Sequence, residues 1–314
     1  MDIAGSTAFK SSRRGEVQPW LPTLYRFFSE FPIQLANRYQ ATEECPRLWK
    51  TLGDEIVFVA EIADHRQVSM HLCRFRDAVS SYREVIKEAD KKLDLKGAAW
   101  LAGFPVGNAM LTLRHGAGNA LEMEDFVGPS IDCGFRLSKH ASPRKLVISV
   151  ETALVVAGTG HKGHDKPAVH VERGEELKGI LGGRPYPKLW IEVPFKDSEK
   201  LHKLEETLFD PPHPPADKDV FDYCKLFIQE YGSPLFQPFI AGDSDFSEQP
   251  AGYEGDMETA CALWKNLVPA GDGEPKGKST TPPEQQVKRE IAKLATIPSG
   301  QPTTKKAPKS SRGR

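Results

Sequence analysis

Two turns of this sequence carry an aspartate among small residues, Asp2-Ile-Ala-Gly-Ser-Thr7 and Lys50-Thr-Leu-Gly-Asp54-Glu55. Hard oxygen ligands hold Mg²⁺ or Mn²⁺, and exposed backbone N–H groups at a strand-to-helix turn hold phosphate oxygens. Asp followed by Gly-Ser-Thr supplies both kinds of group. Either turn alone is common on protein surfaces, because Asp and Gly suit turns. Together the two turns predict a two-metal site for nucleotide chemistry.

The residues around the second turn predict a β-hairpin. Arg47–Leu52 and Glu55–Ala60 are two β segments joined at Gly53 and Asp54, so Lys50 and Asp54 lie beside the hairpin tip. Apolar residues recur at helical spacing on both sides of this hairpin, which predicts helices over 20–39 and 64–92. The hairpin is therefore expected to pack against helices.

A metal-binding aspartate normally ends a buried strand, and no such strand precedes Asp2 in this sequence. We therefore expect the native chain to start upstream of Met1 and to supply that strand. Strands are predicted at 97–104, 110–113 and 145–149, helices at 128–139 and 150–156, and a hairpin pairing 176–179 with 188–193. This order predicts an α+β fold with helices packed on a mixed sheet.

The last third of the chain differs in composition from the rest. Residues 196–265 hold aromatic residues among prolines and are interpreted as a C-terminal extension of a domain formed by 1–195. Residues 266–314 are rich in Pro, Gly, Ser, Thr, Lys and Arg, and cannot bury enough apolar surface to offset their ordering entropy. They are predicted to form a disordered basic tail, with a weak helix at 284–294.

Composition excludes several classes of protein. With 42 Lys and Arg against 43 Asp and Glu among 314 residues, no global field attracts nucleic acid or an anionic membrane. The five cysteines have no metal-ligand spacing, and we interpret them as reduced thiols. No apolar run approaches the roughly 20 residues that cross a bilayer. These features predict a cytoplasmic protein.

A third segment completes the pattern of the two turns: Glu124-Asp-Phe-Val-Gly-Pro-Ser-Ile-Asp-Cys-Gly-Phe-Arg136-Leu. In this order, the three segments resemble the class III nucleotide cyclases. That family carries an Asp-Ile-x-Gly-(Phe/Ser)-Thr turn, a Lys-x-x-Gly-Asp hairpin and a Gly-x-x-(Val/Ile)-Asn-x-Ala-x-Arg helix. The resemblance spans about residues 2 to 193 and implies a ferredoxin-like βαββαβ core with a mixed sheet and flanking helices.

The resemblance implies a role for each matching residue. Asp2, Asp54 and the Ile3 carbonyl would hold two Mn²⁺ or Mg²⁺ ions per site, and the backbone from Ala4 through Gly5 and Ser6 to Thr7 would cradle phosphates. Arg136 would stabilise charge on the α-phosphoryl oxygens, and Lys178 would contact the triphosphate. The base would be read by Lys50 and Asp125, and Asp132 replaces the usual ribose-orienting Asn.

The resemblance also implies a homodimer, because the family's sites lie between two domains and take metal ligands from one and base, ribose and phosphate contacts from the other. Lys50 and Asp54 of one subunit would then serve different sites. The product would be read by a separate effector protein, and neither a membrane nor nucleic acid is expected as a partner.

The choice of base stays open. Lys50 with Asp125 is the pair that adenylate cyclases use, which favours ATP. Two other segments, 97–105 and 176–186, resemble the bacterial pyrimidine cyclases of the Pycsar antiphage system, which make cyclic UMP or cyclic CMP. Bulky groups could fill the volume that a pyrimidine leaves empty in a purine-sized pocket, and the candidates are Trp49, Trp100 and Phe126. We therefore put UTP or CTP first.

Two alternatives remain beside the pyrimidine cyclase. One is an adenylate cyclase, and the other is a non-catalytic nucleotide-binding regulator, favoured by Asp132 and by the absent first strand. Three histidines on predicted helices lack ligand spacing and are given no role: His65, His71 and His140.

Overall fold

The computed structural model describes residues 1–12, 17–115, 121–160, 166–194, 204, 208 and 214–267. The chain forms two compact units, Met1–Ala262 and Leu263–Arg314. In the second unit the description covers only 263–267, the last residues of helix α8 (Tyr253–Leu267). The expected disordered tail from 268 onward and the weak helix at 284–294 lie outside the described residues.

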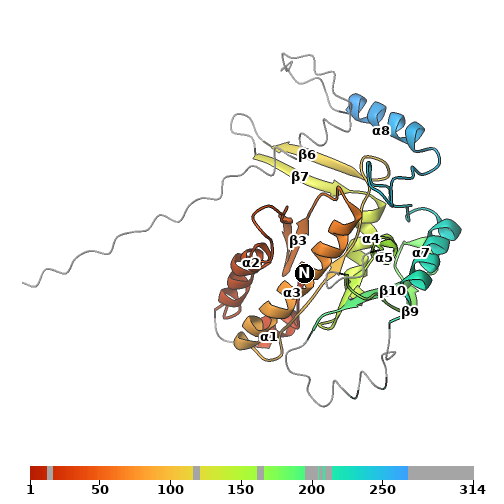
Figure 1. The fold of residues 1–314 in the computed structure, drawn as a ribbon. Helices are drawn as coiled ribbons and strands as arrows, with labels where there is room; N and C mark the ends of the chain where they lie inside the picture. The colour runs from red at the N-terminus through yellow and green to blue at the C-terminus, as the bar shows by residue number, and fades with distance from the viewer. Residues whose placement is uncertain are drawn as a thin grey trace, which may run out of the picture. The chain divides into compact units, whose positions relative to one another are not determined.

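Two four-stranded sheets form the centre of the first unit (Figure 1). The first has the order β2-β3-β1-β4, with bounds Arg47–Leu52, Glu55–Val59, Asp2–Ala4 and Asp94–Lys96. The second has the order β5-β8-β10-β9, with bounds Ala98–Ala99, Lys145–Ile148, Pro185–Glu192 and His170–Glu176. β5 and β8 are parallel, and the other pairs are antiparallel. The α+β class with mixed strand directions is confirmed.

Gly97 joins the two sheets, because it lies between β4 and β5 and its carbonyl accepts a hydrogen bond from the Val147 N–H. A Cβ at this position would come within 3.1 Å of both Leu146 and the Phe75 ring. Glycine therefore allows the extended chain to pass from the first sheet to the second beneath an aromatic side chain.

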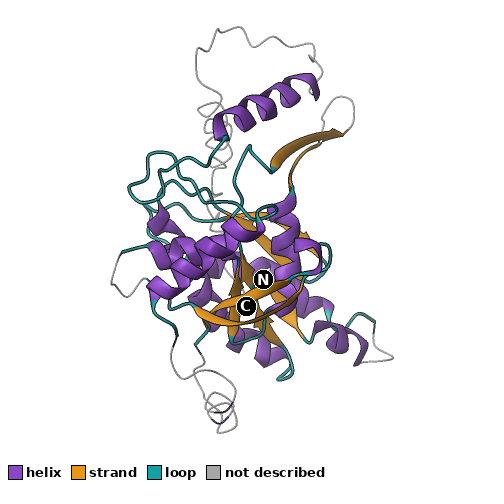
Figure 2. Cartoon of the chain, turned by 90° about the vertical axis from the view of Figure 1, so that its right-hand side faces the viewer, coloured by secondary structure: helices purple, strands orange, loops and turns teal. Residues whose placement is uncertain are grey.

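Helices cover the sheets, as the helices and strands of Figure 2 show. Their bounds are Ser6–Ser12 (α1), Leu21–Ala36 (α2), His65–Ala89 (α3), Pro129–Leu137 (α4), Val150–Gly158 (α5) and Asp217–Tyr231 (α7). Asp64 and Gln67 form a capping box that starts α3. The Phe27, Phe31 and Tyr82 rings pack between α2 and α3, with centroids 5.7 to 6.2 Å apart. No helix in the described ranges is long and apolar enough to cross a bilayer.

Several sequence predictions are confirmed. The hairpin at 47–60 is β2 and β3, and the helices expected over 20–39, 64–92, 128–139 and 150–156 are α2, α3, α4 and α5. The strand expected at 145–149 is β8, and the strand at 110–113 is the middle of β6 (Ala109–His115). These predictions rested on long segments with a regular apolar period and, for the hairpin, on a tight turn.

The short strand that begins at Asp2 was not predicted from the sequence, and the strand expected upstream of Met1 stays a prediction. Asp2–Ala4 forms β1, which pairs with β3 on one side and with β4 on the other. Three residues are too few for a period to be seen in the sequence, and the strand is held by its two neighbours. Asp2 therefore lies within a strand of the sheet.

Other boundaries differ from the predictions. Only Ala98–Ala99 of the strand expected at 97–104 forms a strand, because the Trp100 ring packs against Gly134 of α4. The strand β7 (Leu121–Val127) follows β6 and was not predicted. The pair β6-β7 forms a separate two-stranded ribbon, visible in both figures. The closing hairpin pairs β9 with β10, but 177–179 lie outside it because the chain turns at Gly179 with φ +75°.

Glu151, in the first turn of α5, is a buried carboxyl group with an unusual pKa. Only 4% of it is exposed. Burial raises its pKa to about 7, although contacts with the Ser149 side chain and the Phe236 backbone favour the charged form. The folded protein therefore takes up a proton here that the unfolded chain would have released at neutral pH.

We expect Glu151→Gln to flatten the dependence of stability on pH. A raised pKa in the folded state contributes stability below pH 4.5, and this contribution is lost as the pH rises through about 7. The shift corresponds to about 3 kcal/mol of unfolding free energy. Urea unfolding between pH 4.5 and 8.5 should show this loss in the wild type and not in Glu151→Gln. Equal slopes for both proteins would contradict the assignment.

Candidate active site

Asp2 and Asp54 are brought into contact by the first sheet. Asp2 lies opposite Glu55 on β3 and Lys96 on β4, and Asp54 occupies the turn between β2 and β3. The two carboxyl groups lie within hydrogen-bonding contact of each other. The oxygens of this pair are the donors that Mg²⁺ and Mn²⁺ prefer, so the residues fit a divalent cation.

Three polar side chains surround the carboxylate pair. The Ser6 hydroxyl, almost fully buried, donates to Asp54 Oδ2. Lys10 Nζ lies 3.2 Å from Asp54 Oδ1, and Lys96 Nζ lies 3.1 Å from Asp2 Oδ2. Each carboxylate thus has its own ammonium partner, one from α1 and one from β4.

These contacts affect the two aspartates differently. Burial raises the pKa of Asp2, and its ion pair with Lys96 only partly offsets this effect. Burial acts in the same direction on Asp54, but hydrogen bonds from Ser6 and Lys10 outweigh it and lower the pKa of Asp54. Of the two groups, Asp54 therefore keeps its negative charge to the lower pH.

The backbone of β1 presents Ile3 toward Asp54. Met1 and Ile56 of β3 form two hydrogen bonds. The Met1 ammonium donates to the Ile56 carbonyl at 3.1 Å, and the Ile56 N–H donates to the Met1 carbonyl at 2.8 Å. Backbone groups alternate sides along an antiparallel strand, so those of Ile3 face β3 as well, at the level of Asp54. Gly5 follows with φ +84°, where a Cβ would lie 2.9 Å from the Lys92 carbonyl. The turn that leads into Ser6 and Thr7 therefore requires glycine.

A second polar group joins β2 to β7. Lys50 Nζ donates to Asp125 Oδ1 at 2.7 Å, and it also lies 4.0 Å from the centroid of the Trp49 ring. Arg47, on the same strand, pairs with Glu124 at 3.0 Å. The two residues predicted to read the base are thus in direct contact.

Five aromatic side chains form a continuous cluster beside Lys50 and Asp125. The Trp49 and Phe126 rings pack edge-on with their centroids 4.9 Å apart. The centroid of the Phe135 ring lies 5.3 Å from that of Trp100 and 6.1 Å from that of Trp49. Phe104 completes the cluster, 5.5 Å from Phe126. We call this set the aromatic cluster: Trp49, Trp100, Phe104, Phe126 and Phe135. It contains the three residues proposed from sequence to fill a purine-sized pocket.

Arg136 lies on α4, directly after Phe135 of the aromatic cluster. Its Nε atom donates to the Lys178 carbonyl, and Nη1 lies 3.3 Å from the Asp132 carbonyl one turn earlier. The side chains of Asp132 and Lys178 are exposed. Arg136 thus lies beside the backbone of Asp132, on the same helix as Phe135, and beside the backbone of Lys178, in the segment after β9.

The predicted site residues thus form two groups within one chain. Asp2, Ile3, Gly5, Ser6, Thr7 and Asp54 belong to the first, and Lys50, Asp125, Asp132, Arg136 and Lys178 to the second. Within the described residues, no hydrogen bond or ion pair links these two groups. That arrangement agrees with the expectation that they serve different sites, which stays a prediction.

Lys10, Lys96 and Phe135 were not identified from the sequence. Lys10 follows Ser6 by four residues, so a helix starting at Ser6 places both on one face. That signal was available. The sequence holds no local signal for Lys96, because Lys96 meets its partner Asp2 only through the pairing of β1 with β4.

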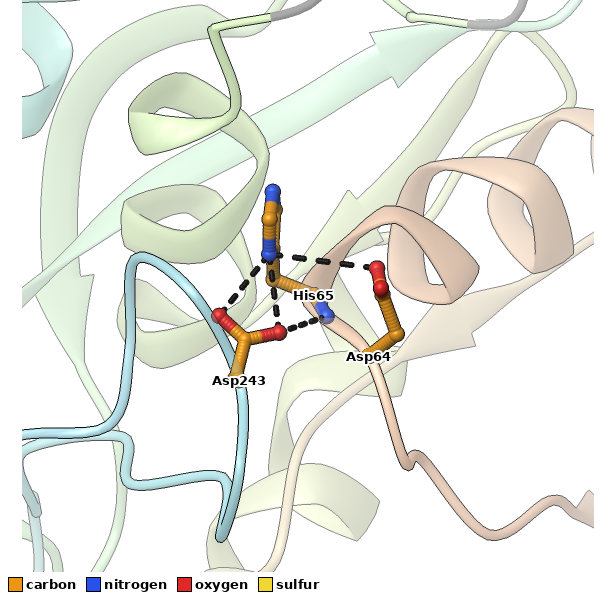
Figure 3. A group of neighbouring side chains, drawn as sticks. All are labelled: Asp64, His65 and Asp243. Atoms are coloured by element: carbon orange, nitrogen blue, oxygen red, sulfur yellow. Dashed lines mark hydrogen bonds and ion pairs between the residues drawn. The ribbon is translucent and has the colours of Figure 1, made fainter.

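His65 belongs to a separate buried cluster, shown in Figure 3. Its Nδ1 atom lies 2.9 Å from Asp243, and its Nε2 atom lies 3.2 Å from Asp245. Asp243 also accepts hydrogen bonds from the backbone of His65, Asp245 and Phe246. Asp64, Asp243 and His65 are close enough to hold a cation, but both ring nitrogens already face carboxylates. The cluster ties the 243–246 segment to the start of α3.

No protein-family model matches the chain, and no curated protein does. The solved structures that are similar include the adenylyl cyclase CyaB from P. aeruginosa, with 16% identity over 63% of this chain and 92% of that chain, and a TM-score of 0.44. The guanylate cyclase domain of RhGC from Catenaria anguillulae, in complex with GTP, has 18% identity over 61% and 92%, with a TM-score of 0.41. The guanylyl cyclase Cya2 has 13% identity over 63% and 91%, with a TM-score of 0.41.

Proposed function

We propose that this chain is a metal-dependent nucleotide cyclase that converts UTP or CTP into the 3′,5′-cyclic monophosphate and pyrophosphate. The observation that carries the proposal is the contact between the Asp2 and Asp54 carboxyl groups, set by β1 and by the turn between β2 and β3. Such a pair has one use that matches the remaining residues, which is to hold divalent cations beside a triphosphate.

The first group of residues holds the reacting end of the nucleotide. Asp2, Asp54 and the Ile3 carbonyl would hold Mn²⁺ or Mg²⁺, two ions per site, which when bound activate the ribose 3′-hydroxyl and neutralise the triphosphate. The backbone from Gly5 to Thr7 donates to the β and γ phosphates. The ribose 3′-hydroxyl loses its proton to solvent and its oxygen attacks the α-phosphorus. The bond between the α-phosphorus and the bridging oxygen breaks, and pyrophosphate leaves.

The second group orients the base and stabilises the developing charge. The Arg136 guanidinium is planar and always charged, which suits the oxygens of the α-phosphoryl group as it becomes trigonal bipyramidal. Lys178 pairs with the triphosphate. Asp132 faces the ribose as a hydrogen-bond acceptor where the cyclase pattern has an amide.

A homodimer brings the two groups together, so that each subunit supplies one group to each of two sites. Apolar side chains are exposed on β2 and β7, the two strands that carry Lys50 and Asp125: Leu48, Leu52, Met123 and Val127. Covering these side chains with a second copy of the chain would remove apolar surface from water.

The aromatic cluster favours a pyrimidine. Trp49, Phe126 and Phe135 occupy volume directly beside the Lys50–Asp125 pair. A single-ring base needs less room than a purine, and it can still present hydrogen-bonding groups to an ammonium and a carboxylate. The product would act as a second messenger in the bacterial cytoplasm, read by a separate effector protein during antiphage defence.

We expect Trp49→Ala to relax the choice of base. Removing the indole opens room for a second ring, so kcat/KM for ATP relative to UTP should rise about 10- to 100-fold. Initial rates with each nucleotide, measured by mass spectrometry of the cyclic product, give this ratio. Trp264→Ala in α8 is the matched control, and it should leave the ratio unchanged. An unchanged ratio in Trp49→Ala would remove the cluster from the base pocket.

Two other functions are favoured by particular observations. The Lys50–Asp125 contact is the pair expected of an adenylate cyclase, which would make cyclic AMP from ATP. Asp132, together with the ammonium partners of both carboxylates, favours a regulator that binds nucleotide without turnover. Separate incubations of the protein with Mn²⁺ and ATP, GTP, CTP or UTP distinguish these functions. Cyclic AMP alone would support the first alternative, and nucleotide binding without product would support the second.

A further inference from the structure

Each carboxylate of the candidate metal pair already has a cationic partner. Lys10 reaches Asp54 from α1, and Lys96 reaches Asp2 from the neighbouring strand β4. The side chains of Lys10 and Lys96 are 30% and 27% exposed. The two ammonium groups can therefore leave the carboxylates for solvent or for another anion without unfolding either element.

Charge makes these lysines competitors of a metal ion. An ammonium about 3 Å from a carboxylate oxygen occupies the place and supplies the charge that a bound cation would supply. Two carboxylates in contact need such compensation, and Lys10 and Lys96 provide it. A cation that binds Asp54 must displace Lys10 from Oδ1, and one that binds Asp2 must displace Lys96 from Oδ2.

We propose that Lys10 and Lys96 are counter-ions that compete with divalent cations for the Asp2–Asp54 pair, and that displaced Lys10 binds a phosphate of the nucleotide. The second half of this inference rests on the proposed function. Lys10 lies one helical turn from Ser6, on the face that contacts Asp54, so its ammonium needs only a change of rotamer to leave the carboxylate.

The consequence is coupling between metal and nucleotide. The metal frees the Lys10 ammonium, and the freed ammonium adds a positive charge for the triphosphate. Without nucleotide, the carboxylates retain their lysine partners and bind metal weakly. By linkage, a nucleotide that captures Lys10 strengthens metal binding to the same extent.

Mn²⁺ binding in the absence of nucleotide tests the first half. Electron paramagnetic resonance measures free Mn²⁺ during titration of the full chain. Lys10→Met and Lys96→Met should each tighten Mn²⁺ binding about tenfold, within the range usual for coupled sites. Lys10→Arg keeps the positive charge and should bind Mn²⁺ like the wild type, as should Lys91→Met, which changes an exposed lysine after α3. Unchanged or weaker binding by both methionine variants would overturn the inference.

The nucleotide KM at saturating Mn²⁺ tests the second half. Lys10→Met should raise the KM about tenfold, opposite in sign to its effect on Mn²⁺, whereas a purely structural defect would weaken both. If Lys10→Met has the same nucleotide KM as the wild type, the proposed contact between Lys10 and a phosphate is wrong. The two proposals can fail separately, because the Mn²⁺ titration needs no turnover. A protein that makes no cyclic product, yet binds Mn²⁺ more tightly as Lys10→Met, would refute the cyclase and support the counter-ions.

Discussion

Asp54→Ala is expected to abolish the formation of cyclic nucleotide, with kcat reduced about 10³-fold or more. The substitution removes the carboxylate of lowered pKa, and with it a proposed ligand for the cations that would activate the 3′-hydroxyl and neutralise the triphosphate. The fold should survive, because Asp54 lies in a turn after Gly53 and is partly exposed. Loss of its hydrogen bonds from Ser6 and Lys10 should cost about 1 kcal/mol of unfolding free energy each.

Product formation by mass spectrometry and thermal unfolding should be measured on the same preparation. Asp77→Ala is the matched control, because Asp77 is an aspartate on α3 whose side chain is 45% exposed and which lies outside both groups. That variant should retain full activity. A folded Asp54→Ala protein that still makes product would remove Asp54 from metal binding and with it the two-metal assignment.

Arg136→Ala is expected to lower kcat about 10²- to 10³-fold, with a smaller effect on KM. Two of the five guanidinium N–H donors contact the Lys178 and Asp132 carbonyls, so donors remain for a phosphoryl oxygen. The proposed contact with the α-phosphoryl group should gain strength as charge develops there, so its loss should affect mainly the transition state. Arg136→Lys should recover little activity, because an ammonium lacks the planar fork.

Steady-state kinetics with varied nucleotide separate the two parameters. Lys139→Ala changes an exposed cation just beyond the end of α4 and should behave like the wild type. A rise in KM with unchanged kcat would show that Arg136 binds ground state and transition state equally, which contradicts the role assigned to it.

Mixing the two inactive variants tests the shared site. If each site takes Asp54 from one subunit and Arg136 from the other, a heterodimer of Asp54→Ala and Arg136→Ala has one intact site and one doubly defective site. Random exchange of subunits should then restore about a quarter of the wild-type activity. Failure of the mixture to recover activity, despite proven subunit exchange, would place both residues in one subunit's own site.

The parts of the fold that were predicted from sequence are those in which a local pattern determines the structure. Helix α3 shows a long apolar period and an Asp–Gln capping box, and the β2-β3 hairpin surrounds a Gly-Asp turn. Strand β7 was missed because acidic residues interrupt its apolar alternation. Glu124 and Asp125 are satisfied there by Arg47 and Lys50 of β2, which is a contact between distant segments.

The candidate site divides in the same way. Asp2, Asp54 and Arg136 stand in recognisable turns and on a recognisable helix, so their residue types and spacing indicated them as candidates, and their roles stay predictions. Lys96 reaches Asp2 only through the pairing of β1 with β4, which no local pattern records, whereas the four-residue spacing of Ser6 and Lys10 was a local signal for Lys10. The aromatic cluster was only partly foreseen, because Phe104 joins Phe126 from a loop and Phe135 joins Trp49 from a helix, and both contacts depend on the complete fold.

One competition assay tests the central claim most directly. The purified protein is incubated with Mn²⁺ and an equimolar mixture of ATP, GTP, CTP and UTP, and mass spectrometry identifies the cyclic products while pyrophosphate is quantified in parallel. The account predicts cyclic UMP or cyclic CMP as the main product, with one pyrophosphate released for each cyclic nucleotide formed. Nucleotide binding with no cyclic product and no pyrophosphate would contradict it.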